Sequence, residues 1–268
     1  MKKQSSEYEF VREKSSWLKK TFKEEKAPSD EPLAVFENSL LLVKNANKSY
    51  GSVKALCNVS LNVSRGKIVG LLGPTGSGKT TLTKLIAGLL TLDSGEIRVL
   101  GKQIGIETKK AVAYLPEKNS LPNRFTVKEA VKFYEDFFED FDRARAEKML
   151  ADLSIDQNEK IKALSKGTKE KVGLVLVMAR KAELYVLDEP LSGVDPAARD
   201  YIIDTIIKNT PESSSVIIST HLISDIERIM DEFVFMKYGE VYTTGTPEEI
   251  RKKYGKSVDS YFREVFRC

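Results

Sequence analysis

Short apolar runs and polar stretches alternate along the chain from about residue 39 onward. Runs rich in Leu, Val and Ile predict strands at residues 40–46, 55–63, 67–73, 95–101, 111–116, 184–189 and 215–220. Helical periodicity predicts helices from the end of the loop at 73–81 to residue 90, and at 127–138, 143–153, 169–181 and 197–209. Residues 231–255 predict a hairpin and a closing helix. Strands that alternate with helices favour parallel pairing and an α/β fold.

The same pattern divides the chain into a charged N-terminal extension and linker at residues 1–38 and one domain at residues 39–268. The helical periodicity that follows the strand at 111–116 predicts a helical subdomain at about 118–180. Within the extension, lysines are interleaved with apolar residues that fall partly at helical spacing: Phe10, Val11, Trp17, Leu18 and Phe22. This segment is either an amphipathic helix against a membrane surface or a partner, or a poorly ordered tail.

Composition excludes several classes of protein. Hydrophobic residues make up 41% of the 268 residues and charged residues 31%, and the net charge of +4 is spread along the chain, so no nucleic-acid partner is expected. The best apolar run, Val172 to Ala179, is too short to cross a bilayer. The N-terminus lacks the apolar core of a secretory signal. Cys57 and Cys268 predict two reduced thiols in the cytosol rather than a disulfide.

A phosphate-binding loop is the strongest single motif. The stretch from Gly73 to Thr80 matches G-x-x-x-x-G-K-[ST], between an apolar strand and a helical pattern. A triphosphate needs many converging N–H donors, so the backbone must approach closely, which glycines permit. Lys79 is expected to bridge the β- and γ-phosphates, and Thr80 to hold Mg²⁺. The loop's predicted nucleotide-binding residues are Gly73, Pro74, Thr75, Gly76, Ser77, Gly78, Lys79, Thr80 and Thr81. The GTPase motif N-K-x-D is absent from the sequence.

Two adjacent carboxylates end the apolar strand at 184–188. Asp188 is expected to ligate Mg²⁺ beside the phosphates, directly or through water. Glu189 is expected to orient or deprotonate the attacking water. The pair therefore extends the prediction from nucleotide binding to nucleotide hydrolysis.

With these motifs in place, the chain resembles the ABC ATPase family over roughly residues 39–250. Residues 71–101 read like that family's Walker A region, and Asp188 and Glu189 like its Walker B. The stretch Leu164, Ser165, Lys166, Gly167 and Thr168 lies where the family carries its LSGGQ signature. Ser192 and Asp195 follow as in the family's D-loop. His221 stands at the switch histidine, and Tyr50 at the aromatic that stacks on adenine.

The resemblance implies a fold and a working unit. The fold is a P-loop NTPase (RecA-like) core with an antiparallel β-subdomain and a helical subdomain. Two such subunits, identical or different, form a head-to-tail dimer in which Ser165 and Gly167 face the γ-phosphate of ATP on the partner. His221 contacts the γ-phosphate within the subunit. Ser165 also has a plain structural reading, as the cap of the next helix.

Two residues depart from the family pattern. Lys166 replaces the first signature glycine, and its side chain either adds positive charge near the partner's nucleotide or points to solvent. Glu117, in YLPEKNS, stands where the family has the glutamine that touches Mg²⁺ and the attacking water. A glutamate keeps an oxygen ligand and adds a negative charge, which is expected to tighten Mg²⁺ binding and shift the pH dependence.

As the resemblance implies, the chain uses ATP and Mg²⁺ and drives transport through a separate integral membrane permease. It would be cytoplasmic and peripheral on the inner face of the cell membrane. The LSKG and YLPE motifs resemble export-type members that handle drugs or antimicrobial peptides. The alternatives are an importer subunit, a soluble ABC ATPase outside transport, and a catalytically weak regulatory subunit.

Overall fold

The computed structural model describes residues 39–118 and 121–266. The N-terminal extension at 1–38, with its two readings, and Cys268 lie outside these residues. The bounds given above for the extension and for the helical subdomain stay predictions. Within the described ranges, no helix is long and apolar enough to cross a membrane.

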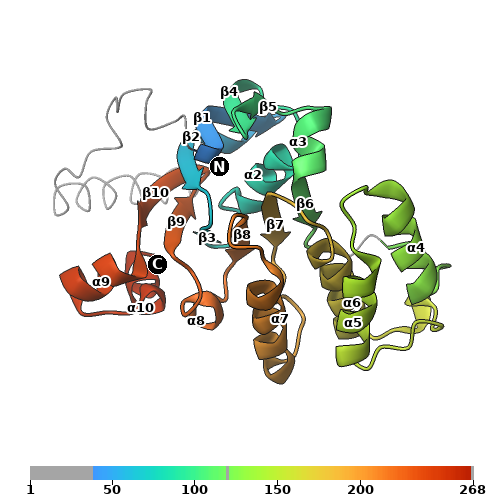
Figure 1. Cartoon of the computed structure of the whole chain (residues 1–268). Coiled ribbons are helices and arrows are strands. Elements are labelled where there is room, and N and C mark those ends of the chain that lie inside the picture. Colours follow the sequence, from blue (N-terminus) through green and yellow to red (C-terminus); the bar gives the residue numbers. More distant parts are fainter. Residues whose placement is uncertain (1–38, 119–120, 267–268) are drawn as a thin grey trace, which may run out of the picture. The chain divides into compact units, whose positions relative to one another are not determined.

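Two sheets carry the strands (Figure 1). The antiparallel sheet has the order β2-β1-β4-β5, with β1 at Ser39–Tyr50, β2 at Val53–Ser64, β4 at Ser94–Val99 and β5 at Lys102–Gln103. The larger sheet has the order β10-β9-β3-β8-β7-β6, with β3 at Ile68–Leu72, β6 at Val112–Leu115, β7 at Leu184–Asp188, β8 at Ser215–Thr220, β9 at Glu232–Lys237 and β10 at Glu240–Gly245. Its strands are parallel except for β10, which pairs antiparallel with β9. The predicted α/β fold with a P-loop core is confirmed.

Most helices fall between these strands in the sequence, and two follow the last strand (Figure 1). They are α2 at Lys79–Ile86, α3 at Ile106–Ala111, α4 at Val127–Phe137, α5 at Arg143–Asp152, the 3-10 helix η2 at Ile161–Ala163, α6 at Lys166–Met178, α7 at Pro196–Asn209, α8 at Ile223–Ile226, α9 at Pro247–Tyr254 and α10 at Val258–Val265. Of these, α4, α5, η2 and α6 lie between β6 and β7, so the chain leaves the parallel sheet after β6 and returns with β7.

Hydrophobic cores cover both faces of the parallel sheet. Strands β7 and β8 are buried at every position, which explains why they read as continuous apolar runs rather than as alternating ones. On one face, Leu82, Leu85 and Ile86 of α2 pack with residues of both sheets. On the other face, the core is built from the strands together with residues of α4 to α10. The predicted strand–helix alternation therefore produces a layered arrangement that fixes the strand ends relative to α2.

Capping residues set where several helices begin. Thr126 and Glu129 form a reciprocal capping box at α4, and Thr246 and Glu249 do the same at α9. The Asp142 carboxylate accepts from the Arg145 N–H at the start of α5. Each cap satisfies N–H groups that the helix itself leaves without an acceptor.

The structure differs from the sequence prediction at three helix ends. Helix α2 ends at Ile86 rather than at residue 90, because Gly88 takes a left-handed φ of 68° just beyond it. Helix α6 begins at Lys166, three residues earlier than predicted, because Ser165 caps it. A second closing helix, α10, follows α9 and packs aromatic side chains against Phe235, with Phe262 at a ring-centroid distance of 5.2 Å.

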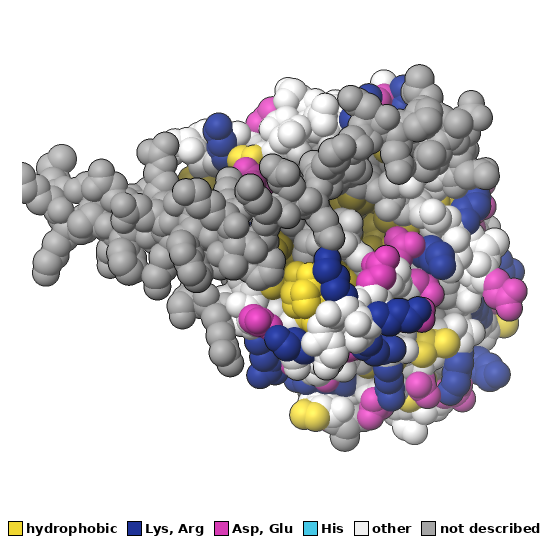
Figure 2. All heavy atoms as spheres, turned by 90° about the vertical axis from the view of Figure 1, so that its left-hand side faces the viewer, with side chains coloured by type: hydrophobic (Ala, Val, Ile, Leu, Met, Phe, Trp, Pro, Cys, Tyr) yellow, Lys and Arg dark blue, Asp and Glu magenta, His cyan; other side chains and the backbone are white. Residues whose placement is uncertain are grey.

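Figure 2 views the side of the molecule on which α9, α10 and β10 lie in Figure 1. Where grey atoms do not cover this face, Lys and Arg side chains are interspersed with Asp and Glu side chains. Ion pairs one helical turn apart contribute to this mixture, including Lys252 with Glu248 at 2.7 Å and Arg263 with Asp259 at 2.8 Å. Exposed pairs of this kind add little to stability, so the closing helices are held mainly by their aromatic contacts.

Candidate nucleotide site

The phosphate loop connects the end of β3 to the start of α2. Its glycines are required by space and by backbone conformation: a Cβ on Gly73 would lie 2.5 Å from the Met236 carbonyl oxygen. Gly78 has a φ of 101°, and a Cβ there would lie 2.6 Å from the Ala55 carbonyl oxygen. The N–H groups of the first turn of α2 have no acceptor within the helix and open toward the loop. Loop and helix end together form a cradle suited to an anion.

The side chain of Lys79 links the end of the loop to its beginning. Its side chain is almost fully buried, and Nζ donates to the carbonyl oxygens of Gly73 at 2.7 Å and Pro74 at 3.2 Å. Nζ also lies 4.0 Å from Glu189 Oε1. Burial lowers the pKa of Lys79, and the charges of Glu189, Asp188 and Glu117 oppose this shift. The ammonium is thus placed among carboxylates at the mouth of the loop.

Asp188, at the end of β7, is buried and surrounded by hydroxyl groups. Thr80 Oγ1 donates to Asp188 Oδ1 at 3.3 Å, and the Ser219 hydroxyl donates to the same oxygen. The Tyr114 phenol lies 3.5 Å from Asp188 Oδ2. Burial, together with the Asp188 charge, raises the pKa of Tyr114, so the phenol stays protonated and can donate. Three hydroxyl groups therefore fix the orientation of one carboxylate.

Sequence reasoning missed Tyr114 and Ser219 in this cluster. Both are ordinary strand residues by their local pattern, Tyr114 on β6 and Ser219 on β8. Their contacts with Asp188 exist because β6 and β8 flank β7 in the sheet order. The only signal for Tyr114 and Ser219 in the sequence was the expectation that parallel strands would pair on both sides of the strand that ends in Asp188 and Glu189.

Glu189 is held in an uncommon backbone conformation. Its φ is 51°, in the left-handed region that non-glycine residues rarely adopt. The Glu189 N–H donates to the Ser219 carbonyl oxygen at 2.9 Å, which ties this turn to β8. Its side chain, only 11% exposed, reaches His221, with Oε2 3.0 Å from Nδ1. Such strain occurs where surrounding contacts impose it, and it is common at functional sites.

His221 stands just beyond the end of β8, and its side chain is half exposed. Lys79, Thr80, Asp188 and Glu189 converge with it at the carboxyl ends of β3, β7 and β8, the edge at which parallel sheets bind ligands. The arrangement offers a buried cation, a fixed carboxylate and a second carboxylate paired with an imidazole. Chemically it can bind a polyphosphate and hold a base next to it.

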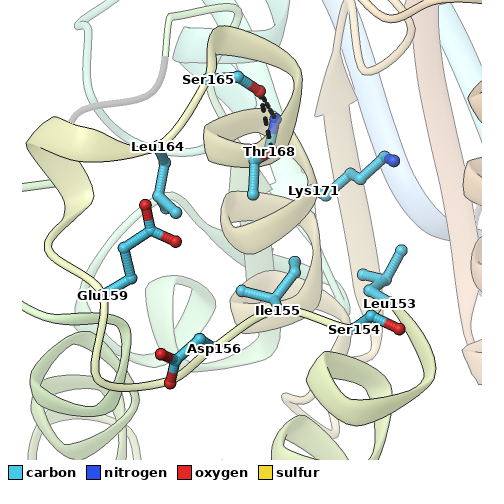
Figure 3. Close-up of a pocket in the computed structure, with 9 residues that line it drawn as sticks. All are labelled: Leu153, Ser154, Ile155, Asp156, Glu159, Leu164, Ser165, Thr168 and Lys171. Atoms are coloured by element: carbon cyan, nitrogen blue, oxygen red, sulfur yellow. Dashed lines mark hydrogen bonds between the residues drawn. The ribbon is translucent and has the colours of Figure 1, made fainter.

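The signature residues lie at the start of α6. Ser165 caps the helix, with Oγ accepting from the Thr168 N–H at 3.1 Å and lying 2.8 Å from Thr168 Oγ1. Figure 3 shows both side chains at the rim of a small pocket of about 230 Å³, which residues of the α5–η2 connection also line. Among the described residues, no hydrogen bond or ion pair joins residues 164–168 to the phosphate loop or to Asp188 and Glu189.

The remaining predicted residues lie around this centre. Tyr50, at the end of β1, is 49% exposed, and its ring lies 6.0 Å from Lys48 Nζ. Glu117 follows β6, and its charge acts on both Lys79 and Tyr114. Asp195 caps α7 by accepting from the Ala198 N–H at 3.0 Å. The role of each predicted site residue stays a prediction.

Three features together define the class of ATP-binding cassette ATPases. They are a phosphate loop after one parallel strand, two carboxylates at the end of another strand of the same sheet, and a separate helical segment that carries a signature sequence. Comparisons with known proteins place the chain in the same class. The family model described as "ABC transporter" matches residues 56–192. The chain belongs to this family, and it is an ATP-binding and ATP-hydrolysing subunit of an ABC transporter.

Curated relatives match most of the chain. The ABC transporter ATP-binding protein YtrB of Bacillus subtilis is 30% identical over 220 residues, which are 81% of this chain and 75% of the relative. The linearmycin resistance ATP-binding protein LnrL of the same species is 30% identical over 225 residues, covering 81% and 72%. The Nod factor export ATP-binding protein I of Rhizobium etli is 29% identical over 215 residues, covering 77% and 68%.

Solved structures share the fold. A structure described as the ATP-binding subunit of an ABC transporter superposes with a TM-score of 0.77 at 29% identity, covering 85% of this chain and all of the other. The ATP-binding cassette MJ0796, a dimer in a post-hydrolysis state with ADP and Pi, gives a TM-score of 0.69 at 24% identity and covers 77% and 98%. The second likeness supports the fold alone.

Proposed function

We propose that this ATPase powers export through a separate integral membrane permease, and that it works as one of two ATPase subunits that share their ATP sites. The observation that carries the proposed site is the convergence of Lys79, Asp188, Glu189 and His221 at one edge of the parallel sheet. Relatives named for lipopolysaccharide export, Nod factor export and linearmycin resistance support the direction.

Lys79 is the proposed phosphate ligand. Its ammonium donates to the carbonyl oxygens of Gly73 and Pro74, which are weaker partners than a triphosphate. Binding of ATP exchanges these neutral contacts for charged ones at little cost in desolvation, because the ammonium is already buried. Tyr50, exposed at the end of β1, is the proposed stacking surface for adenine.

The proposed metal ion is Mg²⁺. Thr80 Oγ1 and Asp188 Oδ1 lie 3.3 Å apart at the helix start, and both are hard oxygen donors of the type that Mg²⁺ prefers. When bound, the ion would neutralise developing charge on the phosphates. Asp188 is prepared for such a ligand because its orientation is already fixed by Ser219 and Tyr114. Glu117 adds a carboxylate at the same edge.

Glu189 is the proposed general base, and His221 its partner. The 3.0 Å contact between Glu189 Oε2 and His221 Nδ1 holds the carboxylate away from Asp188, toward the space in front of the loop. From there Glu189 can orient a water for attack on the terminal phosphate. His221 keeps its other nitrogen free to contact that phosphate, as half of the imidazole is exposed.

The second subunit follows from the position of the signature. Ser165 and Thr168 sit on a helix start that makes no hydrogen bond to the phosphate loop within the described residues, yet a helix start is suited to bind phosphate. A head-to-tail dimer would bring this helix start to the partner's ATP. Hydrolysis would then remove the contacts that keep the dimer closed.

Glu189→Gln tests the site. The variant should bind ATP normally, hydrolyse it on the order of 100-fold more slowly or worse, and accumulate as an ATP-bound dimer in size-exclusion chromatography. Glu248→Gln is the matched control, because Glu248 is exposed on α9, which follows the end of β10 at the opposite edge of the sheet. Normal turnover in Glu189→Gln would refute the assigned role.

The same Glu189→Gln variant tests the permease partner. When it is affinity-purified from detergent-solubilised membranes with ATP, it should bring down one integral membrane protein in stoichiometric amount. Recovery of the chain from the soluble fraction only, with no membrane protein attached, would favour an ABC ATPase outside transport. If the permease is found, reconstitution into vesicles with ATP outside distinguishes export from import by the side on which cargo accumulates.

A further inference from the structure

The side chain of Lys166 is exposed to solvent, but it does not extend away from the protein. It folds back over Gly193, in the connection between β7 and α7, within its own chain. A Cβ placed on Gly193 would lie 2.7 Å from Lys166 Nζ, 2.9 Å from Cε and 3.5 Å from Cδ. Three successive side-chain atoms of Lys166 therefore run along the space beside the glycine backbone.

A lysine in this position needs a local reason. Lys166 is the first residue of α6, where the helix dipole disfavours a positive charge, and the first turn holds no acidic residue. Glu170, one turn further along, offers a partial counter-charge. The contact with the 192–194 turn also favours a lysine here, because the long side chain packs along the turn.

The covered segment is a tight turn in which Val194 is buried, whereas Gly193 at its tip is exposed. Gly193 has a φ of 74°, in the left-handed region, and carries no side chain to fill the space above it. The Ser192 N–H donates to the Glu189 carbonyl oxygen at 3.0 Å, and the Val194 N–H to the Leu191 carbonyl oxygen at 3.4 Å. The turn thus begins at Glu189, the proposed base, and its tip is covered by the first residue of the signature helix.

We propose that Lys166 is a positioning residue that joins the start of α6 to the 192–194 turn within one subunit, so that the signature and the D-loop move as one unit. The contact stands on its own, whereas its effect on turnover rests on the proposed function. A glycine at position 166 would leave the turn uncovered and the two segments free to move separately.

Amide hydrogen exchange in the nucleotide-free chain tests the contact without any enzymatic reaction. Lys166→Ala and Lys166→Met should speed exchange of the Ser192 and Val194 amides on the order of threefold or more, the expected result of loosening a local structural unit. Lys166→Arg should keep most of the protection. Lys171→Ala is the matched control, because Lys171 lies on the same helix but lines the pocket of Figure 3. Unchanged exchange at 192 and 194, or a rise spread evenly over the molecule, would overturn the proposal.

Steady-state kinetics of ATP hydrolysis test the effect of this contact on turnover. Lys166→Ala should lower the kcat of ATP hydrolysis while KM for ATP changes less than about twofold, and Lys166→Arg should restore kcat. A raised KM with unchanged kcat would instead show that Lys166 contacts the partner's nucleotide, and unchanged values of both would show that the contact positions nothing. Failure of the proposed function appears differently, as normal turnover in Glu189→Gln with the exchange pattern of the Lys166 variants intact.

Discussion

Arg180 provides a quantitative test of how the helical segment is attached to the parallel sheet. Its side chain is 4% exposed and lies at the end of α6. The guanidinium bonds Asp140, between α4 and α5, at 3.0 Å, and donates to the carbonyl oxygens of Val112 at 2.8 Å and Lys110 at 2.5 Å. Its Cζ atom lies 4.1 Å from the Phe138 ring centroid. One side chain thus links the α4–α5 connection to the start of β6.

Arg180→Met keeps most of the volume of the side chain and removes its donors. Loss of one partner of a buried ion pair destabilises by about 3–5 kcal/mol, and each carbonyl left without a donor costs about 1 kcal/mol or more. The Asp140 side chain is 26% exposed, so water can partly replace the guanidinium and the pair falls at the lower end of its range. The expected loss in free energy of unfolding is therefore about 5 kcal/mol, a large share of the 5–15 kcal/mol typical of a domain.

Equilibrium unfolding in urea measures this loss directly, and thermal unfolding should show a drop in Tm of roughly 10–20 °C. Arg98→Met is the matched control, because Arg98 forms a half-exposed pair with Glu96 at 2.6 Å, and its loss should change stability by about 0.5 kcal/mol or less. Asp140→Asn should approach the effect of Arg180→Met, since it leaves the buried guanidinium without its counter-charge. A loss below about 1 kcal/mol in Arg180→Met would refute the idea that this residue holds the helical segment to the sheet.

Three further substitutions test the site. Lys79→Ala should abolish binding of a fluorescent ATP analogue, whereas Lys84→Ala, in the last turn of the same helix, should bind normally; binding by both would contradict the role of Lys79. Glu117→Gln removes one negative charge near Lys79, so half-maximal ATPase activity should need several-fold more Mg²⁺, and an unchanged Mg²⁺ titration would exclude Glu117 from the metal site. Tyr114→Phe removes one of three hydroxyl partners of Asp188, and the ATPase rate should fall about fivefold, equivalent to about 1 kcal/mol; an unchanged rate would mean that Thr80 and Ser219 suffice.

Features that depend on local chemistry could be predicted from the sequence. The phosphate loop could be predicted because Gly73 and Gly78 stand where no side chain fits, and the buried strands because each contains a run of apolar residues. The contacts of Tyr114 and Ser219 with Asp188 were not readable, because they depend on which strands become neighbours in the sheet. The direction of the Lys166 side chain depends in the same way on where the 192–194 turn passes.

Asp188 and Glu189 illustrate how adjacent carboxylates come to serve different tasks. In a regular strand, neighbouring side chains point to opposite faces, which would send one of the two into the core. The left-handed φ of Glu189 breaks this alternation directly after β7. Asp188 consequently stays among the hydroxyls of Thr80, Ser219 and Tyr114, while Glu189 turns toward Lys79 and His221. The bond from the Glu189 N–H to the Ser219 carbonyl holds that turn in place, and the turn continues to residue 193, beneath Lys166. A change at the signature helix can therefore reach the proposed base through five residues of backbone, without passing through the nucleotide.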